Sequence, residues 1–232
     1  MNYTFRFAPV WTRVDQLLEG LTTTLWLSAA VIALGFAIGV AGALASRSRS
    51  RTLRGAVLGY VEAIRNTPLL AQIFFLFFGL PALGVRLDAV PAALLALVIN
   101  LGAYSTEIVR AGLDAVPRGQ IDAGTALGLR RWQIMRLIVI KPALKIVFPA
   151  LASQFTLLML ATSIVSQIGV KELFHQASMI DSATYRSFEV YAVVCLFYLA
   201  IALAFRLFFA GLHWLIFAER VRPPPPGSVV AP

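Results

Sequence analysis

Long apolar stretches separated by short polar segments dominate the chain. The stretch from Leu21 to Ala45 carries no charged residue and exceeds the roughly 20 apolar residues that a helix needs to cross a bilayer. Further stretches of this kind predict five transmembrane helices in all, over approximately residues 21–45, 60–85, 89–106, 140–168 and 190–218. The pattern therefore predicts an all-α, polytopic membrane protein.

Two of the predicted spans depart from a simple apolar helix. The second is short unless Gly59–Ile64 begins it, and the fourth is too long for one straight helix. We therefore expect the start of the fourth near Lys141 to lie outside the membrane. In the first span, Gly35, Gly39 and Ala43 recur every four residues, a spacing that lets a second helix approach closely.

Composition supports a membrane location and excludes several classes of function. The 232 residues are 59% apolar and 13% charged, with a mean hydropathy of +0.80, which is not typical of a soluble enzyme. The net charge of +9 would suggest nucleic acid in a soluble protein, but here it indicates basic cytoplasmic loops, so we expect no nucleic acid partner. A single cysteine, Cys195, permits no internal disulfide and no cysteine metal cluster, and we expect no metal site.

The distribution of Lys and Arg orients the predicted spans. Residues 46–67, 107–145 and the C-terminal tail together carry fourteen of these residues, and the segments on the opposite side carry five. By the positive-inside rule, the N-terminal segment 1–20 faces outward and the C-terminus is cytoplasmic. Residues 218–232 contain four consecutive prolines, Pro223–Pro226, and are predicted to be a disordered cytoplasmic tail.

The long polar segment at 107–139 is predicted to be structured. A Gly/Pro-rich turn ends one helix, and residues 120–127 then predict a short amphipathic helix that ends at Gly128. A helix of this length is only marginally stable by itself. Its stability must therefore come from docking on another surface. Small residues at 123, 124 and 126 with apolar Ile121 and Leu127 suit a groove on a partner, but packing under the chain's own spans is an equally good interpretation.

This segment resembles the EAA loop of ABC importer permeases, in particular the polar amino acid uptake group. The matching stretches are Ala103–Gly112, Val116–Gln120, Ala126–Leu129 and Lys141–Leu144. Flanking stretches agree with the same family, namely Arg65–Leu70, Phe78–Pro81, Thr162–Ser163, Ile168–Leu173 and Phe188–Tyr191. The resemblance covers roughly residues 15–217.

The resemblance implies one transmembrane domain over 21–217 with the type I importer permease fold and a coupling loop at 107–139. The residues that would dock on a separate ATPase are Gln120, Asp122, Ala123, Gly124, Ala126, Leu127 and Gly128. The other implied partners are a second permease subunit, a periplasmic or extracellular amino-acid-binding protein and membrane lipid, in a bacterial inner membrane. No Gly-Lys-Ser/Thr sequence occurs, so the chain is expected to be no enzyme and to bind no cofactor, with ATP and magnesium on the partner ATPase.

The chain departs from the family pattern at two places. Asp122-Ala123-Gly124 stands where the family usually has Glu-Ala-Ala, and a glycine inside a helix costs about 1 kcal/mol relative to alanine. Leu160-Ala161 stands where the family commonly has Lys-Asp before Thr162 and Ser163. The second departure allows the substrate contacts to reside mainly in the partner permease.

Polar side chains within the apolar spans are candidates for the substrate pathway, because such groups are costly in a bilayer. We single out Asn100, Gln154, Thr162 and Ser163. Each could instead join helices, and for the two hydroxyls a hydrogen bond to their own helix is the more common role. On the outward side, the candidate contacts for a binding protein are Lys171, Glu172, His175 and Asp181, which could equally be ordinary loop residues.

Two other classes of function compete with the importer. A carrier driven by an ion gradient would need acidic residues inside the spans, yet every Asp and Glu falls at a span end or in a loop. A membrane enzyme would need clustered reactive groups, whereas His175 and His213 are far apart in the sequence. Arg206 lies within the last span and is expected to extend toward the cytoplasmic edge.

Overall fold

The computed structural model describes residues 4–217, and helices are the regular elements throughout that range. The predicted tail, 218–232, therefore lies outside the described residues, as do residues 1–3. The α-helices are α1 (Ala8–Trp11), α2 (Val14–Ala45), α3 (Arg51–Arg65), α4 (Leu69–Phe74), α5 (Ala89–Asp114), α6 (Arg118–Ala126), α7 (Arg131–Gln133), α8 (Ile140–Ala161), α9 (Leu173–Thr184) and α10 (Ser187–Phe217).

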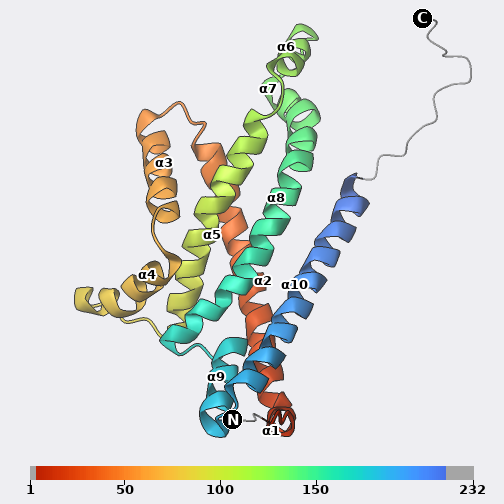
Figure 1. Ribbon diagram of the computed structural model, residues 1–232. Coiled ribbons are helices and arrows are strands. Elements are labelled where there is room, and N and C mark those ends of the chain that lie inside the picture. Colours follow the sequence, from red (N-terminus) through yellow and green to blue (C-terminus); the bar gives the residue numbers. More distant parts are fainter. Residues whose placement is uncertain (1–3, 218–232) are drawn as a thin grey trace, which may run out of the picture.

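Long helices form the body of the molecule and short ones lie at its two ends. Helix α5 packs between α2 and α8, and α10 contacts α8 and α9 (Figure 1). Helices α6 and α7 project at one end, while α1 and α9 lie at the opposite end (Figure 1). The segment predicted to be the coupling loop and the segment predicted to face outward are thus separated by the length of the bundle.

Three helices are long and apolar enough to cross a membrane, namely α2, α5 and α10, and four spans result if α3 and Leu69–Leu83 count as one. That pair is bent by 107°, so residues 60–85 do not form one straight helix, and the predicted span there is either a broken span or a re-entrant loop. Pro68 explains the break, because it lacks an N–H and restricts the residue before it. Helix α8 is not among the helices that are both long enough and apolar enough to cross a membrane. The count of five spans therefore stays a prediction.

The predicted span 140–168 also contains two kinds of helix. Helix α8 includes Pro149 and ends at Ala161, and a tighter 3₁₀ helix follows over Thr162–Ile168. Gly169 ends this segment with φ of 84°, a left-handed conformation that glycine adopts without a steric penalty. The chain then turns into α9 at the end of the bundle opposite α6 (Figure 1).

Glycines on one face of α2 allow a close contact with α5. A Cβ added at Gly35 would lie 2.9 Å from the Leu101 side chain of α5, and one at Gly39 or Gly42 would overlap Ser105 or Thr106. Ala43, on the same face, is fully buried. The spacing noted in the sequence is therefore confirmed as a packing surface.

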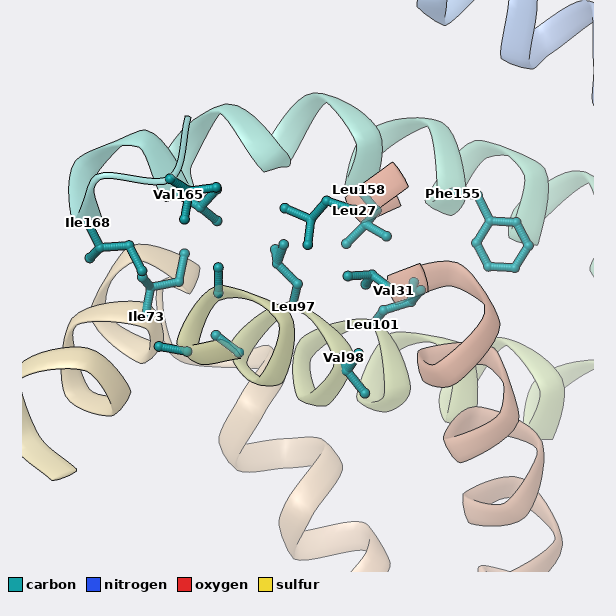
Figure 2. Close-up of a cluster of buried hydrophobic side chains, with 14 of the residues drawn as sticks. Leu27, Val31, Ile73, Leu97, Val98, Leu101, Phe155, Leu158, Val165 and Ile168 are labelled. Carbon is teal, nitrogen blue, oxygen red and sulfur yellow. The ribbon is translucent and has the colours of Figure 1, made fainter. Parts of the chain in front are cut away.

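The main hydrophobic core lies where α2, α5 and α8 meet. Figure 2 shows Leu27 and Val31 of α2 near Leu97 and Leu101 of α5, with Leu158 of α8 above them. Val165 and Ile168 from the 3₁₀ segment and Ile73 of α4 close one end of the cluster (Figure 2). This cluster joins the bent α3–α4 segment to the straight helices.

A buried carboxylate lies where three helices meet, at the end of the bundle that carries α9. Glu172 is 0% exposed and precedes α9, where its side chain accepts hydrogen bonds from the backbone N–H groups of Phe174 (2.9 Å) and His175 (2.7 Å). The hydroxyl of Tyr198 on α10 also donates to it, at 2.8 Å, and Thr24 of α2 accepts from the Leu173 N–H at 3.2 Å. Burial raises the pKa of Glu172, and the three donors oppose that rise by favouring the carboxylate.

The α2–α5 contact predicts opposite effects for the same substitution at two glycines. We expect Gly39→Ala to destabilise the protein by about 1–3 kcal/mol, because the added methyl group overlaps Ser105. Gly55→Ala on α3, where nothing lies within 4 Å of the added Cβ, should be neutral or stabilising by up to about 1 kcal/mol. Thermal unfolding of both variants in detergent measures the difference, and a Gly39→Ala protein as stable as Gly55→Ala would contradict the close packing.

Candidate functional site

The short helix predicted within the polar loop is present as α6. It begins at Arg118, directly after Pro117, and ends at Ala126. Gly128 has φ of 74°, and its N–H donates to the Thr125 carbonyl at 3.0 Å, while the Leu129 N–H donates to the Gly124 carbonyl at 3.1 Å. This left-handed cap stops the helix at the position that the sequence indicated.

One face of α6 packs on its own chain. Gly124 is the buried residue of this helix, and a Cβ added there would lie 2.5 Å from Ile138 Cδ1 and 3.3 Å from Ile134 Cγ1. Both isoleucines belong to the π-helical segment Ile134–Val139 that leads into α8. Ile121 joins the same small hydrophobic cluster. Packing under the chain's own elements, one of the two interpretations left open by the sequence, therefore applies to this face.

The other predicted coupling residues are exposed within residues 4–217. They are Gln120, Asp122, Ala123 and Ala126 of α6, and Leu127 and Gly128 directly after it. Leu127, directly after α6, has 80% of its surface exposed, the second largest exposed fraction among the large apolar side chains of residues 4–217. The seven predicted coupling residues thus divide into one buried glycine and six exposed residues.

The glycine at position 124 has a packing explanation. A methyl group would meet the flexible end of Ile138, which would have to move, whereas glycine leaves room for that side chain. The helix propensity lost through glycine is therefore offset by a close contact beneath α6. Gly124, one of the residues at which the chain departs from the family pattern, thus lets α6 lie close to the bundle.

Ion pairs tie together the helix ends near α6. Arg47, just after α2, contacts Asp114 at the end of α5 at 2.6 Å, and Arg110 contacts Glu107 at 2.6 Å and Asp114 at 3.2 Å. These side chains are partly exposed, so each pair contributes little by itself. Because they share Asp114 and Arg110, they form one network that fixes α2 relative to the base of the coupling loop.

The pathway candidates do not converge on one site. Asn100 on α5 is buried and donates to Gln72 Oε1 at 3.0 Å, while Gln72 donates to the Ile64 carbonyl at 2.8 Å. Asn100 thus supports the break between α3 and α4. Gln154 lies partly buried on α8.

The hydroxyl candidates bond within their own helix. Thr162 donates to the Met159 carbonyl at 2.6 Å and Ser163 donates to the Leu160 carbonyl at 2.8 Å. This is the common role expected for such groups in apolar helices. No hydrogen bond described for residues 4–217 joins any two of Asn100, Gln154, Thr162 and Ser163.

The end of the bundle that carries α9 has a polar pocket of about 430 Å³ between the start of α2 and α9. Its lining residues are Arg13, Gln16, Glu19, Lys171, His175, Gln176, Met179 and Ala183. One guanidinium nitrogen of Arg13 is buried there without a hydrogen bond partner among residues 4–217. Sequence reasoning missed Arg13, Gln16 and Glu19, because nothing in the sequence indicates that they lie beside a segment more than 150 residues away.

Two of the four predicted outward contacts line this pocket. Lys171 and His175 do so, whereas Glu172 is fully buried in the α9 cap and offers no surface to a partner. Asp181 accepts a hydrogen bond from Ser187 at 2.8 Å, which links α9 to α10. The expectation for Glu172 is therefore wrong, because its acceptor capacity is used inside the fold.

Comparisons with known proteins agree with this arrangement. The family described as binding-protein-dependent transport system inner membrane component matches residues 32–213. The glutamine transport system permease protein GlnP of Escherichia coli (strain K12) is 34% identical over 201 residues, covering 86% of this chain and 92% of GlnP. The L-cystine transport system permease protein TcyB of Bacillus subtilis (strain 168) is 38% identical, covering 74% of this chain and 76% of TcyB.

A solved structure has the same fold. The chain matches a crystal structure of an amino acid ABC transporter with histidines at a TM-score of 0.86 and 34% identity, covering 91% of this chain and 99% of the other. The helical bundle and the short helix displayed at one end define a membrane permease subunit of an ABC importer. The chain belongs to the family of inner membrane components of binding-protein-dependent transport systems.

The Asn100–Gln72 contact predicts a structural role for Asn100. We expect Asn100→Ala to lower the free energy of unfolding by about 1 kcal/mol, because the Gln72 side chain loses a donor within the apolar bundle. A double-mutant cycle with Gln72→Ala, followed by thermal unfolding in detergent, measures the coupling. Purely additive effects, with altered substrate affinity in Asn100→Ala alone, would assign Asn100 to the pathway instead.

Proposed function

We propose that this chain forms, with a second permease of the same fold, the membrane pathway for a polar amino acid that a soluble binding protein delivers. The observation that carries the proposal is α6, which is anchored to its own bundle through Gly124 and presents Leu127 away from it. A separate ATPase subunit binds ATP and magnesium and receives this exposed face. The chain itself binds no cofactor and no metal, and it catalyses no reaction.

The coupling mechanism follows from how α6 is attached. Closure of two ATPase subunits on ATP displaces α6, and the contact of Gly124 with Ile134 and Ile138 passes that displacement to α8. The ion pairs of Arg47 and Arg110 carry it to α2 and α5. Because these helices are closely packed, they move as a body and alternate the pathway between the two sides of the membrane.

The substrate class rests on the relatives and on the pathway residues. GlnP and TcyB are named for the transport of glutamine and L-cystine, both polar amino acids. Gln154 of α8, which is partly buried, is the candidate of this chain that remains available to a substrate, since Thr162 and Ser163 bond to their own backbone. Leu160-Ala161 offer no charge, so charged substrate contacts belong to the second permease.

The proposed orientation places α6 in the cytoplasm and α9 outside a bacterial inner membrane. The excess of Lys and Arg in residues 46–67 and 107–145 supports this direction. The pocket of Arg13, Lys171 and His175 then faces the compartment of the binding protein. Arg13 and Lys171 are its cationic groups, and they suit a carboxylate on that protein beside the pocket's own Glu19.

Affinity capture tests the proposed assembly. A tag on the C-terminal tail allows the chain to be purified from its native membrane in mild detergent, with mass spectrometry of the associated proteins. The proposal predicts an ABC ATPase and a permease of the same family in stoichiometric amounts. A chain that purifies alone and transports on an ion gradient would contradict it.

A substitution on the exposed face of α6 tests the docking surface. We expect Leu127→Ser to reduce the amount of ATPase retained by about tenfold or more, because a leucine buried at an interface contributes roughly 1.5–3 kcal/mol. Leu53→Ser on α3, which is also exposed, is the matched control and should retain the ATPase. Thermal stability of the two variants should be equal. If Leu127→Ser retained as much ATPase as the wild type, α6 would not be the docking element.

A further inference from the structure

A groove between α8 and α10 is not explained by the transport machinery described above. It has a volume of about 720 Å³ and is lined by Phe148, Pro149, Ala152, Ser153, Thr156, Ala202, Leu203, Arg206, Phe209, Ala210 and His213. Small side chains on the facing surfaces, Ala152 and Ser153 on α8 and Ala202 and Ala210 on α10, leave the space open.

The groove lies in the half of the bundle nearest α6. Ile201 is the last buried residue of α10, and beyond it α10 runs beside α8 toward the end that carries α6 (Figure 1). In this half, α10 is held by aromatic contacts, with Phe209 near Phe155 and Phe217 near Phe148. The groove therefore lies between two apolar helices that meet there mainly through aromatic side chains.

Arg206 gives the groove a charge that nothing in the described chain neutralises. Residues 140–161 and 190–217 contain no Asp or Glu, and no ion pair described for residues 4–217 involves Arg206. A guanidinium is always charged and suits phosphate oxygens particularly well. An isolated arginine within an apolar helix is costly unless it meets an anion or reaches water.

The spacing along α10 matches the edge of a membrane leaflet. Arg206 and His213 are seven residues apart on the same face, which corresponds to about 10 Å along the helix. Trp214 follows and is largely exposed, as expected of a side chain at headgroup level. An anion near that level is within reach of both Arg206 and His213, whereas the deeper wall is apolar.

We propose that this groove binds an anionic phospholipid of the leaflet on the α6 side. Its phosphate lies between Arg206 and His213, and an acyl chain runs along Phe148 and Phe209 toward Ala202. At the deep end, the Thr156 hydroxyl donates to the Ala152 carbonyl at 2.9 Å. Its hydrogen is therefore already bonded and needs no acceptor from the acyl chain of the lipid. The aromatic wall favours a lipid over a small zwitterionic substrate, which has no long apolar part to bury.

Native mass spectrometry of the assembled transporter tests the proposal, with phosphatidylglycerol and phosphatidylcholine as the added probes. Wild-type protein should retain phosphatidylglycerol after delipidation, in preference to phosphatidylcholine. Arg206→Gln should weaken that retention by about fivefold, the loss expected for one basic residue acting on an anionic lipid. Arg54→Gln on α3, an exposed arginine away from the groove, should retain the lipid as wild type does.

Two further variants distinguish the effect of the groove's shape from the effect of its charge. Ala210→Phe fills the groove without altering charge and should also lower phosphatidylglycerol retention, while Arg206→Lys should preserve most of it. Equal retention in wild type and Arg206→Gln would overturn the proposal. Displacement of the lipid by a free amino acid, or loss of the second permease in Arg206→Gln, would assign the groove to substrate or to the partner subunit instead.

Discussion

The close approach of α2 and α5 is the constraint on which the rest of the structure depends. Gly35, Gly39 and Gly42 let the backbone of α2 approach α5, so that Leu101, Ser105 and Thr106 occupy space that larger residues would fill. Inside a bilayer, such packing replaces the hydrophobic effect as the main source of helix association. Helix α8 then packs on α5, and the bent α3–α4 segment closes one end of the core (Figure 2).

Polar groups fix the two ends of this core, where the partners are proposed to act. Glu172 joins α9, α10 and, through the adjacent Leu173 N–H, α2 at the α9 end. Asp114 pairs with Arg47 and Arg110, which joins α2 to the base of the predicted coupling loop at the α6 end. These contacts would pass the proposed displacement of α6 to the closely packed helices between the two ends, which is what a mechanically driven permease requires.

The sequence predicted the features that depend on local pattern and missed those that depend on distant contacts. Three features could be predicted because each follows from residue spacing or from one glycine. They are the apolar spans, the small-residue face of α2 and the helix that ends at Gly128. Apolarity alone could not reveal the 107° bend at Pro68, nor that Glu172 is buried by Tyr198. Arg13 lies far in sequence from Lys171 and His175, so their shared pocket had no sequence signal.

The most direct test is the energy source of transport. The purified assembly is reconstituted in vesicles, with ATP enclosed on the α6 side and the binding protein loaded with a radiolabelled polar amino acid on the other. The account predicts uptake that requires hydrolysable ATP and continues after ionophores collapse all ion gradients. Uptake that persists without ATP and stops when the gradients are collapsed would contradict the coupling role of α6 and support an ion-driven carrier.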